Sequence, residues 1–348
     1  MKPIIGITMG DAAGIGAEIT AKMFKYEKIY SICSPVLIGS KIVLEDIINI
    51  LQISNLELKC IKNIEDSLWE DNVINLIDLD NIKSGDYKFG KISPVTGKAS
   101  GEYIAKGIQM AISNQIDAIV TNPIHKESFT LGGYGKKYAG HTEMLADLTG
   151  IEDYTMMLVA GNLRVVHVST HVSLKKAVGM VEKSRILKVI KIANEACNLL
   201  GIRNPKIVVA GLNPHCGEGG LFGDEEIREI IPAVEKAQAL GINALGPLPS
   251  DSVFAKALGG VYDVVVTMYH DQGHIPTKTV GFVWDKDSNS WGKMHGVNVT
   301  LGLPIIRTSV DHGTAFGKAG KGSADYTSLF EALKYAVTMA KNKKQAVG

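Results

Sequence analysis

The feature that most constrains the fold is the alternation of short apolar runs with longer amphipathic segments along the whole chain. The runs are rich in Val and Ile and are bounded by Gly, Pro or Asn, which is typical of buried β-strands. The predicted strands are Pro3–Thr8, Pro35–Ile38, Val73–Leu76, Ala118–Thr121, Thr155–Val159, Arg164–Ser169, Lys206–Ala210, Val261–Thr267 and Val297–Leu301. The predicted helices are Ala17–Phe24, Lys41–Leu51, Gly101–Ile112, Thr142–Thr149, Ser184–Leu200, Asp224–Leu240, Ser250–Leu258 and Asp325–Lys341.

Near-continuous apolar strands between helices indicate parallel sheets that are covered by helices on both faces. The predicted class is therefore α/β. At roughly 100–200 residues per domain, the 348 residues suggest about two domains. In such sheets, functional side chains gather in the loops at the carboxyl ends of the strands.

Charge and composition exclude several classes of protein. Lys and Arg number 37 and Asp and Glu 36, which gives a net charge of +1. A protein that binds nucleic acid or an anionic membrane is expected to carry a clear basic excess. The apolar share of 45% fits a folded globular protein, and no run approaches the length of a membrane span. We therefore expect neither a nucleic-acid nor a membrane partner.

The cysteines and the first residues point to the cytoplasm. Cys33, Cys60, Cys197 and Cys216 form no CxxC pair, and four cysteines are too few for a disulfide framework in a chain of this length. The start, MKPIIGITMGDAAGIG, has only a short apolar run before Gly and Asp, unlike a signal peptide. A reducing compartment fits both observations.

The loops after the predicted strands are unusually polar, which favours one convergent site. They are rich in His, Asp, Asn and Gly. Their sequences are TMGDAAGIGAE, TNPIHKE, YAGHTE, STHVS, GLNPHCGEGGLFGDEE and MYHDQGHIPTK.

Three histidines, His171, His215 and His270, directly follow predicted strands. Three imidazoles with an open fourth position form the ligand set of a catalytic zinc-like site. They lie 44 and 55 residues apart, so no local spacing motif supports this reading. Structural, hydrogen-bonded histidines are the alternative, and the residues alone leave both open.

Two glycine-rich loops precede predicted helices. The first, Gly10–Gly16, is neither GxGxxG nor a P-loop. Its free amides could face an anion, or its glycines could simply allow a tight turn. The second contains Gly217, Gly219 and Gly220, which are weak candidates for binding the cofactor.

Further polar residues lie near the last predicted strands. Arg307 could hold a carboxylate or phosphate through two parallel hydrogen bonds, with Lys278 and Asn298 nearby in sequence. A solvated charge is the simpler reading of a lone Arg or Lys. Asp251 lies at a predicted helix start and is most simply a helix-terminus residue.

Taken together and in order, these loops resemble the 4-hydroxythreonine-4-phosphate dehydrogenase family of vitamin B6 biosynthesis along nearly the whole chain. The stretches LNPHCGEGG, YHDQG and TSVDHGTA are each specific. The resemblance implies a homodimer of the two-domain isocitrate/isopropylmalate-dehydrogenase-like α/β/α fold, with a cleft between the domains. We assign 1–130 plus 300–348 to the first domain, with the termini together, and 131–299 to the second.

The resemblance also implies roles for individual residues. A divalent metal would be held by His171, His215 and His270, the last supplied by the partner subunit, so that the active site is shared. Asp251 matches a further site position in GPLPSD. The implied substrate contacts are His141, Thr142, Lys278, Asn298 and Arg307.

Departures from the family pattern bear on the substrate. Ala12 and Ala17 stand where the family usually has prolines. The stretch Val283–His295 is longer than in the vitamin enzyme, and His274 replaces an apolar residue. These last two features resemble the branch that oxidises 4-phospho-D-threonate or 4-phospho-D-erythronate. The alternative substrate is 4-phosphohydroxy-L-threonine, which would give 3-amino-2-oxopropyl phosphate.

The implied chemistry is an oxidation followed by a decarboxylation. NAD or NADP would take hydride from the C3 carbon, and the β-keto acid would lose CO2 to give dihydroxyacetone phosphate. The cation would stabilise the negative charge in both steps. Imidazole ligands favour Zn or Co over Mn or Mg. Lys126 and Asp251 are candidate proton acceptors, and Asp271 is a candidate for orienting His270.

Two other classes remain as rivals. A phosphoacyl transferase can share this general fold, since a fold does not determine function. A non-catalytic sugar-phosphate-binding protein would keep Arg307 and Lys278 without needing a metal.

Overall fold

The computed structural model describes residues 2–286 and 290–347, and these divide into two compact units. The first unit contains Met1–Glu152 and Leu303–Lys344. The second contains Asp153–Gly302, with Gln345–Gly348 grouped with it. Among the described residues, no helix combines the length and the apolar composition needed to cross a membrane.

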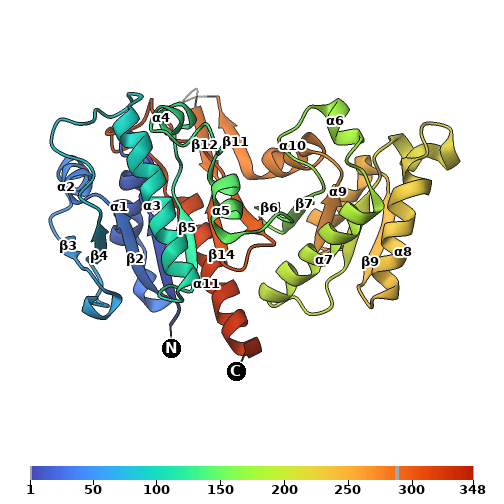
Figure 1. Cartoon of the computed structure of the whole chain (residues 1–348), viewed down its shortest axis with the longest axis horizontal. Coiled ribbons are helices and arrows are strands. Elements are labelled where there is room, and N and C mark those ends of the chain that lie inside the picture. The colour runs from blue at the N-terminus through green and yellow to red at the C-terminus, as the bar shows by residue number, and fades with distance from the viewer. Residues whose placement is uncertain (1, 287–289, 348) are drawn as a thin grey trace. The chain divides into compact units, whose positions relative to one another are not determined.

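The first unit is a parallel sheet in the order β3-β4-β2-β1-β5-β14, with every pairing between these neighbours parallel (Figure 1). Helix α3 lies against β1, β2 and β5. The strands are β1 Ile4–Thr8, β2 Ser34–Gly39, β3 Glu57–Cys60, β4 Val73–Asp78, β5 Ala118–Thr121 and β14 Ile306–Val310. The helices are α1 Gly16–Tyr26, α2 Lys41–Ile50, α3 Pro94–Ile112, α4 Lys126–Leu131, α5 His141–Thr149 and α11 Thr327–Val347.

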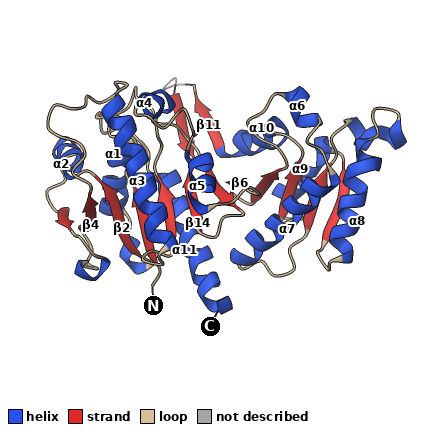
Figure 2. Cartoon of the chain, viewed as in Figure 1, coloured by secondary structure: helices blue, strands red, loops and turns tan. Residues whose placement is uncertain are grey.

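The second unit has the strand order β13-β6-β7-β10-β8-β9. Figure 2 shows helices flanking the strands of this unit. The strands are β6 Thr155–Ala160, β7 Leu163–His167, β8 Ile207–Ala210, β9 Ala244–Leu248, β10 Val264–Thr267 and β13 Val297–Leu301, with a separate hairpin of β11 Phe282–Asp285 and β12 Ser290–Met294. The helices are α6 Leu174–Val178, α7 Lys183–Leu199, α8 Ile231–Ala239, α9 Ser250–Leu258 and α10 His270–Gly281.

The core of the second unit shows why its strands read as continuous apolar runs. Val265 of β10 packs with Val253 and Ala257 of α9 in one buried cluster. Successive strand side chains point to opposite faces, so Val264 and Val266 lie on the face away from that cluster. Both are fully buried, and α7 also lies against β10. A strand covered on both faces is therefore apolar at consecutive positions, as Val264, Val265 and Val266 are.

Two elements differ from the sequence-based expectation of parallel strands joined by loops. Strand β6 runs antiparallel to both β7 and β13, because β6 and β7 are joined by a short turn at Gly161 and Asn162. The stretch MYHDQGHIPTK, expected to be a loop, forms most of α10 from His270 onward. Its Gly and Pro residues hide the helical pattern from sequence, and Pro276 lies inside the helix.

The boundary between the two units falls at Glu152–Asp153 and not at residue 130. Helices α4 and α5 both pack against α3, so the segment that contains them belongs to the first unit. His141 and Thr142, which we had placed in the second domain, therefore lie in the first unit. The second boundary, at Gly302–Leu303, lies close to the expected residue 300.

Candidate active site

The strand order of the second unit explains how distant histidines approach one another. His171, His215 and His270 follow β7, β8 and β10. These strands are adjacent and parallel in the order β7-β10-β8. Their carboxyl ends therefore share one edge of the sheet, and the three histidine loops lie side by side there.

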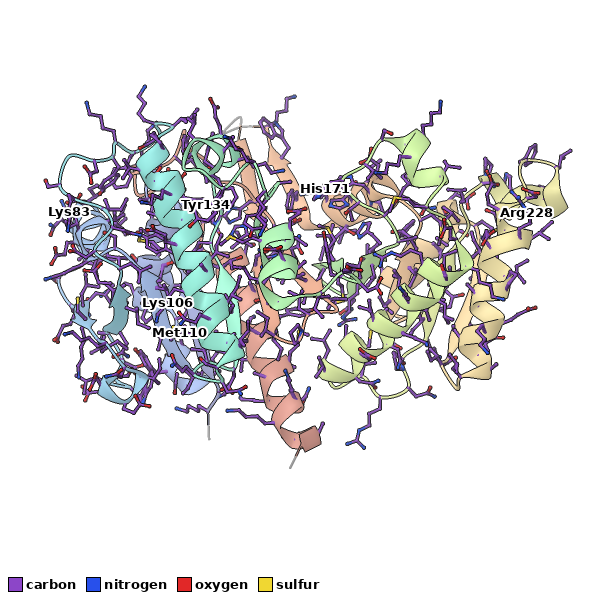
Figure 3. All side chains as sticks on the ribbon, viewed as in Figure 1. Lys83, Lys106, Met110, Tyr134, His171 and Arg228 are labelled. Atoms are coloured by element: carbon purple, nitrogen blue, oxygen red, sulfur yellow. The ribbon has the colours of Figure 1, made fainter. Side chains whose placement is uncertain are left out.

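Two of the three histidines meet in a pocket of about 470 Å³ at this edge. The rings of His171 and His270 have centroids 5.8 Å apart and are inclined by 46°. His171 is labelled in Figure 3, on the chain segment that leads into α6. The pocket is lined by Thr170, His171, Val172, Ser173, Leu174, Ala177, Tyr269, His270 and Asp271.

The His270 ring is held on two sides. Its Nδ1 lies 2.6 Å from Oδ1 of Asp271. The ring of His274 stacks on it, with centroids 3.5 Å apart and planes inclined by 13°. His274 is itself fixed by a 2.9 Å contact of its Nδ1 with the carbonyl oxygen of His270. With Nδ1 engaged by a carboxylate, Nε2 is the nitrogen that is left to bind a ligand.

A third imidazole extends the stack into the interior. The ring centroid of His167 lies 4.8 Å from that of His274. His167 is fully buried, and burial, followed by the charge of His274, lowers the pKa of His167 to about 3. Burial, followed by the charge of His270, lowers the pKa of His274 to about 4. Both side chains are therefore neutral near pH 7.

His215 lies in the neighbouring loop, in a turn of unusual handedness. The φ angles of His215, Cys216 and Glu218 are +52°, +56° and +43°. Left-handed backbone costs an L-residue about 1 to 2 kcal/mol. Gly217 has a φ of +79°, and a Cβ there would lie 2.7 Å from the carbonyl oxygen of Gly223, so glycine is required. This conformation explains the glycines of the loop without a bound cofactor.

Within the described ranges, no three His, Cys, Asp or Glu side chains form a group that could hold a metal ion. The structure thus brings together two of the three predicted ligands, His171 and His270. His215 lies on the adjacent loop but outside that pair.

Gln272, which the sequence analysis did not single out, ties the loops at this edge together. Its Oε1 accepts a hydrogen bond from the amide of Met268 at 2.6 Å. Its Nε2 donates to the carbonyl oxygen of Gly211 at 2.6 Å and to Oγ of Ser250 at 2.8 Å. Gln272 lies in the HDQG stretch, next to Asp271, and this position in a quoted motif is the one sequence feature that points to it. Its role depends on two segments distant in sequence, at Gly211 and Ser250, so no local pattern reveals it.

Asp251 lies beside the His215 turn, as the second residue of α9. It is exposed, and its charge contributes to a raised pKa of the Cys216 thiol, after burial and the charge of Glu226. The other candidate proton acceptor, Lys126, is an exposed residue at the start of α4 in the first unit.

Two of the predicted substrate contacts, Asn298 and Lys278, lie in the second unit. The Asn298 Oδ1 atom is buried and has no hydrogen-bond partner among the described residues. Its Nδ2 lies 4.0 Å from the sulfur of Met156. The ammonium of Lys278 lies 4.4 Å from the centre of the Phe282 ring.

The first unit contains a buried cation, Arg307, which is one of the predicted substrate contacts. The guanidinium of Arg307 on β14 is almost fully buried and donates to Thr121 Oγ1 from Nη2 at 2.6 Å and from Nε at 3.2 Å. Burial lowers the pKa of Arg307 to about 9, and the charge of Glu143 opposes this shift. Arg307 therefore remains cationic at neutral pH.

His141 opens α5 near this guanidinium, with Thr142 next to it. Burial, and then the charge of Arg307, hold the pKa of His141 well below its ordinary value, so its ring is neutral. Its Nε2 atom is buried without a protein partner in the part of the chain that is described. Buried polar atoms are normally hydrogen-bonded, so an unpartnered one beside a buried cation is an argument for a ligand.

The first glycine loop does not resemble an anion site. Gly10 has a φ of +77°, and a Cβ there would lie 2.5 Å from the carbonyl oxygen of Pro123. The amide of Ala13 donates to Oδ1 of the fully buried Asp11 at 2.9 Å, so this amide is already used. Of the two readings of this loop, the structure favours the tight turn.

The comparisons with known proteins agree on one family. The model of the family "Pyridoxal phosphate biosynthetic protein PdxA" matches residues 31–336. A protein of Oceanobacillus iheyensis named "Putative D-threonate 4-phosphate dehydrogenase" is 48% identical over 343 residues, which cover 98% of this chain and 99% of that protein.

Comparison with solved structures points to the same family. The 4-hydroxythreonine-4-phosphate dehydrogenase of Burkholderia phymatum is 44% identical, with a TM-score of 0.82 over 97% of this chain and 98% of that one. The enzyme of that name from Klebsiella pneumoniae is 38% identical, with a TM-score of 0.84 over 97% and 100% of the two chains. These likenesses confirm the predicted isocitrate/isopropylmalate-dehydrogenase-like α/β class. The chain belongs to the PdxA family and is an oxidoreductase, a dehydrogenase.

Proposed function

We propose that this protein oxidises the C3 hydroxyl of 4-phospho-D-threonate or 4-phospho-D-erythronate with NAD or NADP, and that the keto acid then loses CO2 to give dihydroxyacetone phosphate. The observation that carries the proposal is the His171–His270 pair, with the His270 ring fixed by Asp271 at the wall of a pocket. The dehydrogenase names of the relatives favour it over acyl transfer or simple binding.

Imidazole nitrogen is a preferred ligand of Zn²⁺ and similar cations. The pocket at this edge of the sheet holds two of the three proposed ligands of one chain, with ring centroids 5.8 Å apart. When bound, such a cation supplies Lewis-acid stabilisation of negative charge on a substrate oxygen. Imidazole ligands favour Zn or Co, with Mn and Mg as alternatives.

We propose that the ligand set is completed in a homodimer. His171, His215 and His270 would be the three ligands, with His270 supplied by the partner subunit, as the family resemblance implies. The stacked His274 and the carboxylate of Asp271 would keep Nε2 of His270 aimed at the pocket.

The chain's own cations and amides would hold the substrate anions. Arg307 presents a desolvated positive charge, which attracts an anion more strongly than a hydrated one does. The unpartnered Nε2 of His141 and Oδ1 of Asn298 would each gain a hydrogen bond from the ligand. Thr142 and Lys278 would contribute a hydroxyl and a second cation.

The proton of the C3 hydroxyl needs an acceptor within hydrogen-bond reach. Asp251 is the better candidate on position, since it lies in the same unit as the His171–His270 pocket and beside the His215 turn. Lys126 remains the alternative. Gly217, Gly219 and Gly220 remain weak candidates for binding the cofactor. The left-handed turn already explains why glycine stands at these positions.

The substrate branch rests on two features of the second unit. His274 stacks directly on His270, and the β11–β12 hairpin occupies part of Val283–His295, the stretch that the vitamin enzyme largely lacks. The name of the Oceanobacillus relative supports the same branch. The alternative is the vitamin B6 reaction on 4-phosphohydroxy-L-threonine.

One assay tests the proposal. The purified protein, supplied in turn with Zn, Co, Mn or Mg, is given each of the three phosphorylated acids with NAD or NADP, and NADH or NADPH formation is followed. We expect the highest kcat/KM with one of the two sugar acids. A clear preference for 4-phosphohydroxy-L-threonine would assign the protein to the vitamin B6 branch. No turnover of any of the three acids would refute the proposed function.

A further inference from the structure

The turn that carries His215 is held from outside by one buried carboxylate. Six consecutive residues, 215–220, have positive φ, three of them not glycine. Backbone hydrogen bonds at the turn include Cys216 N to Asn213 O at 3.1 Å, Phe222 N to Gly217 O at 3.1 Å and Leu221 N to Glu218 O at 3.4 Å. L-residues disfavour this conformation, so contacts from outside the turn help to hold it.

Glu226 contacts the turn from outside. Its Oε1 accepts hydrogen bonds from the amides of Leu212 and Asn213, both at 2.7 Å. Its Oε2 accepts from Asn213 Nδ2 at 2.9 Å. The same carboxylate packs against Gly217, where a Cβ would lie 3.1 Å from Oε2. One side chain therefore contacts the turn just before His215 and just after it.

The burial of Glu226 and its position at the start of a helical turn also tie it to the His215 loop. It is 1% exposed and opens a π-helical turn, Glu226–Ile230, that leads into α8; Arg228, labelled in Figure 3, lies in this turn. A buried carboxylate is costly unless hydrogen bonds satisfy it, and here three N–H groups of the His215 loop do so. The loop and the carboxylate thus depend on each other.

We propose that Glu226 is a positioning residue that sets the left-handed turn and thereby the direction of the His215 imidazole. The inference rests on the proposed function, in which His215 is a ligand. Outer residues that orient ligands commonly change metal affinity by about 10- to 100-fold when they are replaced. A residue that merely stabilised the fold would not alter metal affinity in protein that remains folded.

The test compares Glu226→Gln with Glu235→Gln in the full-length protein. Glutamine keeps the size of Glu226 but turns one acceptor into a donor that faces N–H groups. Glu235 is an exposed residue of α8 and serves as the matched control for charge. Asn213→Ala, which removes one of the three donors and leaves both amides, provides a milder variant if Glu226→Gln fails to fold.

Two readouts are needed. Hydrogen exchange of peptides that span 211–223 is measured in the metal-free protein, where we expect exchange to rise about 10-fold in Glu226→Gln. Zn²⁺ and Co²⁺ affinity is measured by calorimetry, where we expect a loss of about 10- to 100-fold. Asn213→Ala should change both in the same direction by less, and Glu235→Gln should match the parent protein.

The outcomes separate this inference from the proposed function. If the parent protein binds no metal and oxidises none of the acids, the proposed function fails whatever Glu226 does. If the parent is active and Glu226→Gln matches Glu235→Gln in exchange and in affinity, the positioning role is wrong. If exchange rises while metal affinity stays unchanged, Glu226 is structural, and the inference is equally overturned.

Discussion

At the scale of single residues, the proposed site depends on polar groups that hold its loops and rings in place. Asp271 holds Nδ1 of His270, and Gln272 joins three loops of the sheet edge. The role of Asp271 could be predicted, because it is adjacent to a histidine in sequence. The role of Gln272 could not, because Gly211 and Ser250 are distant from it in sequence and follow other strands.

Replacing Asp271 by Asn should weaken metal binding without unfolding the protein. The amide cannot match the charge-assisted bond to Nδ1, so the His270 ring loses its fixed tautomer and orientation. We expect the metal Kd to rise by about 10- to 100-fold. Calorimetric titration with Zn²⁺ measures it, and an unchanged Kd would show that Asp271 does not orient His270.

The buried His167 predicts an acid-sensitive stability. Its folded pKa of about 3 lies below its ordinary value of 6.5, so the unfolded chain binds more protons between these values. The free energy of unfolding should therefore fall as the pH is lowered from 6.5 toward 3, by about 3 to 5 kcal/mol from this group. Urea unfolding at several pH values measures the slope. The variant His167→Gln should have a shallower slope than the parent; equal slopes would contradict the assignment.

At the scale of elements, the strands were predictable where burial on both faces makes them continuously apolar. The partly exposed β3 and β9 have no such pattern and were missed. The buried β14 was also missed, because its sequence IRTSV is not continuously apolar. The sequence indicated which loops form the site, but it did not indicate the backbone conformation of those loops. No residue pattern indicated that LNPHCGEGG would turn left-handed, since Glu226, which lies outside the motif, contributes to that conformation.

A buried ion pair joins α1 to the segment before α11, and removing it should be costly. Glu18 is fully buried, accepts hydrogen bonds from the amides of Gly322 and Ala324, and pairs with Lys22 at 3.0 Å. In Glu18→Ala, the ammonium of Lys22 stays largely buried without its carboxylate, so we expect a loss of about 3 to 5 kcal/mol.

The matched control for this pair is Glu45→Ala. The Lys41–Glu45 pair has the same helical spacing, but both side chains are about half exposed. Its loss should cost about 0 to 1 kcal/mol. Urea unfolding measures the free energy of unfolding of both variants. Similar decreases in the two variants would mean that the Glu18 contacts contribute little to stability.

At the scale of the whole molecule, we expect two chains to complete one site. His215→Ala and His270→Ala should each fold and dimerise but lose metal and nearly all turnover. If these two residues act from different protomers, a mixed dimer regains one intact site. An equal mixture, refolded together, should then recover about a quarter of the parent activity. No recovery would place all the ligands within one chain.

Whether a metal drives both oxidation and carbon loss is tested by the ratio of CO2 released to NADH formed from 4-phospho-D-threonate, measured on metal-loaded protein and after chelation. We expect one CO2 for each NADH, loss of both on chelation, and return of both with Zn²⁺ or Co²⁺. Full turnover by metal-free protein, or NADH formed without CO2, would contradict this expectation.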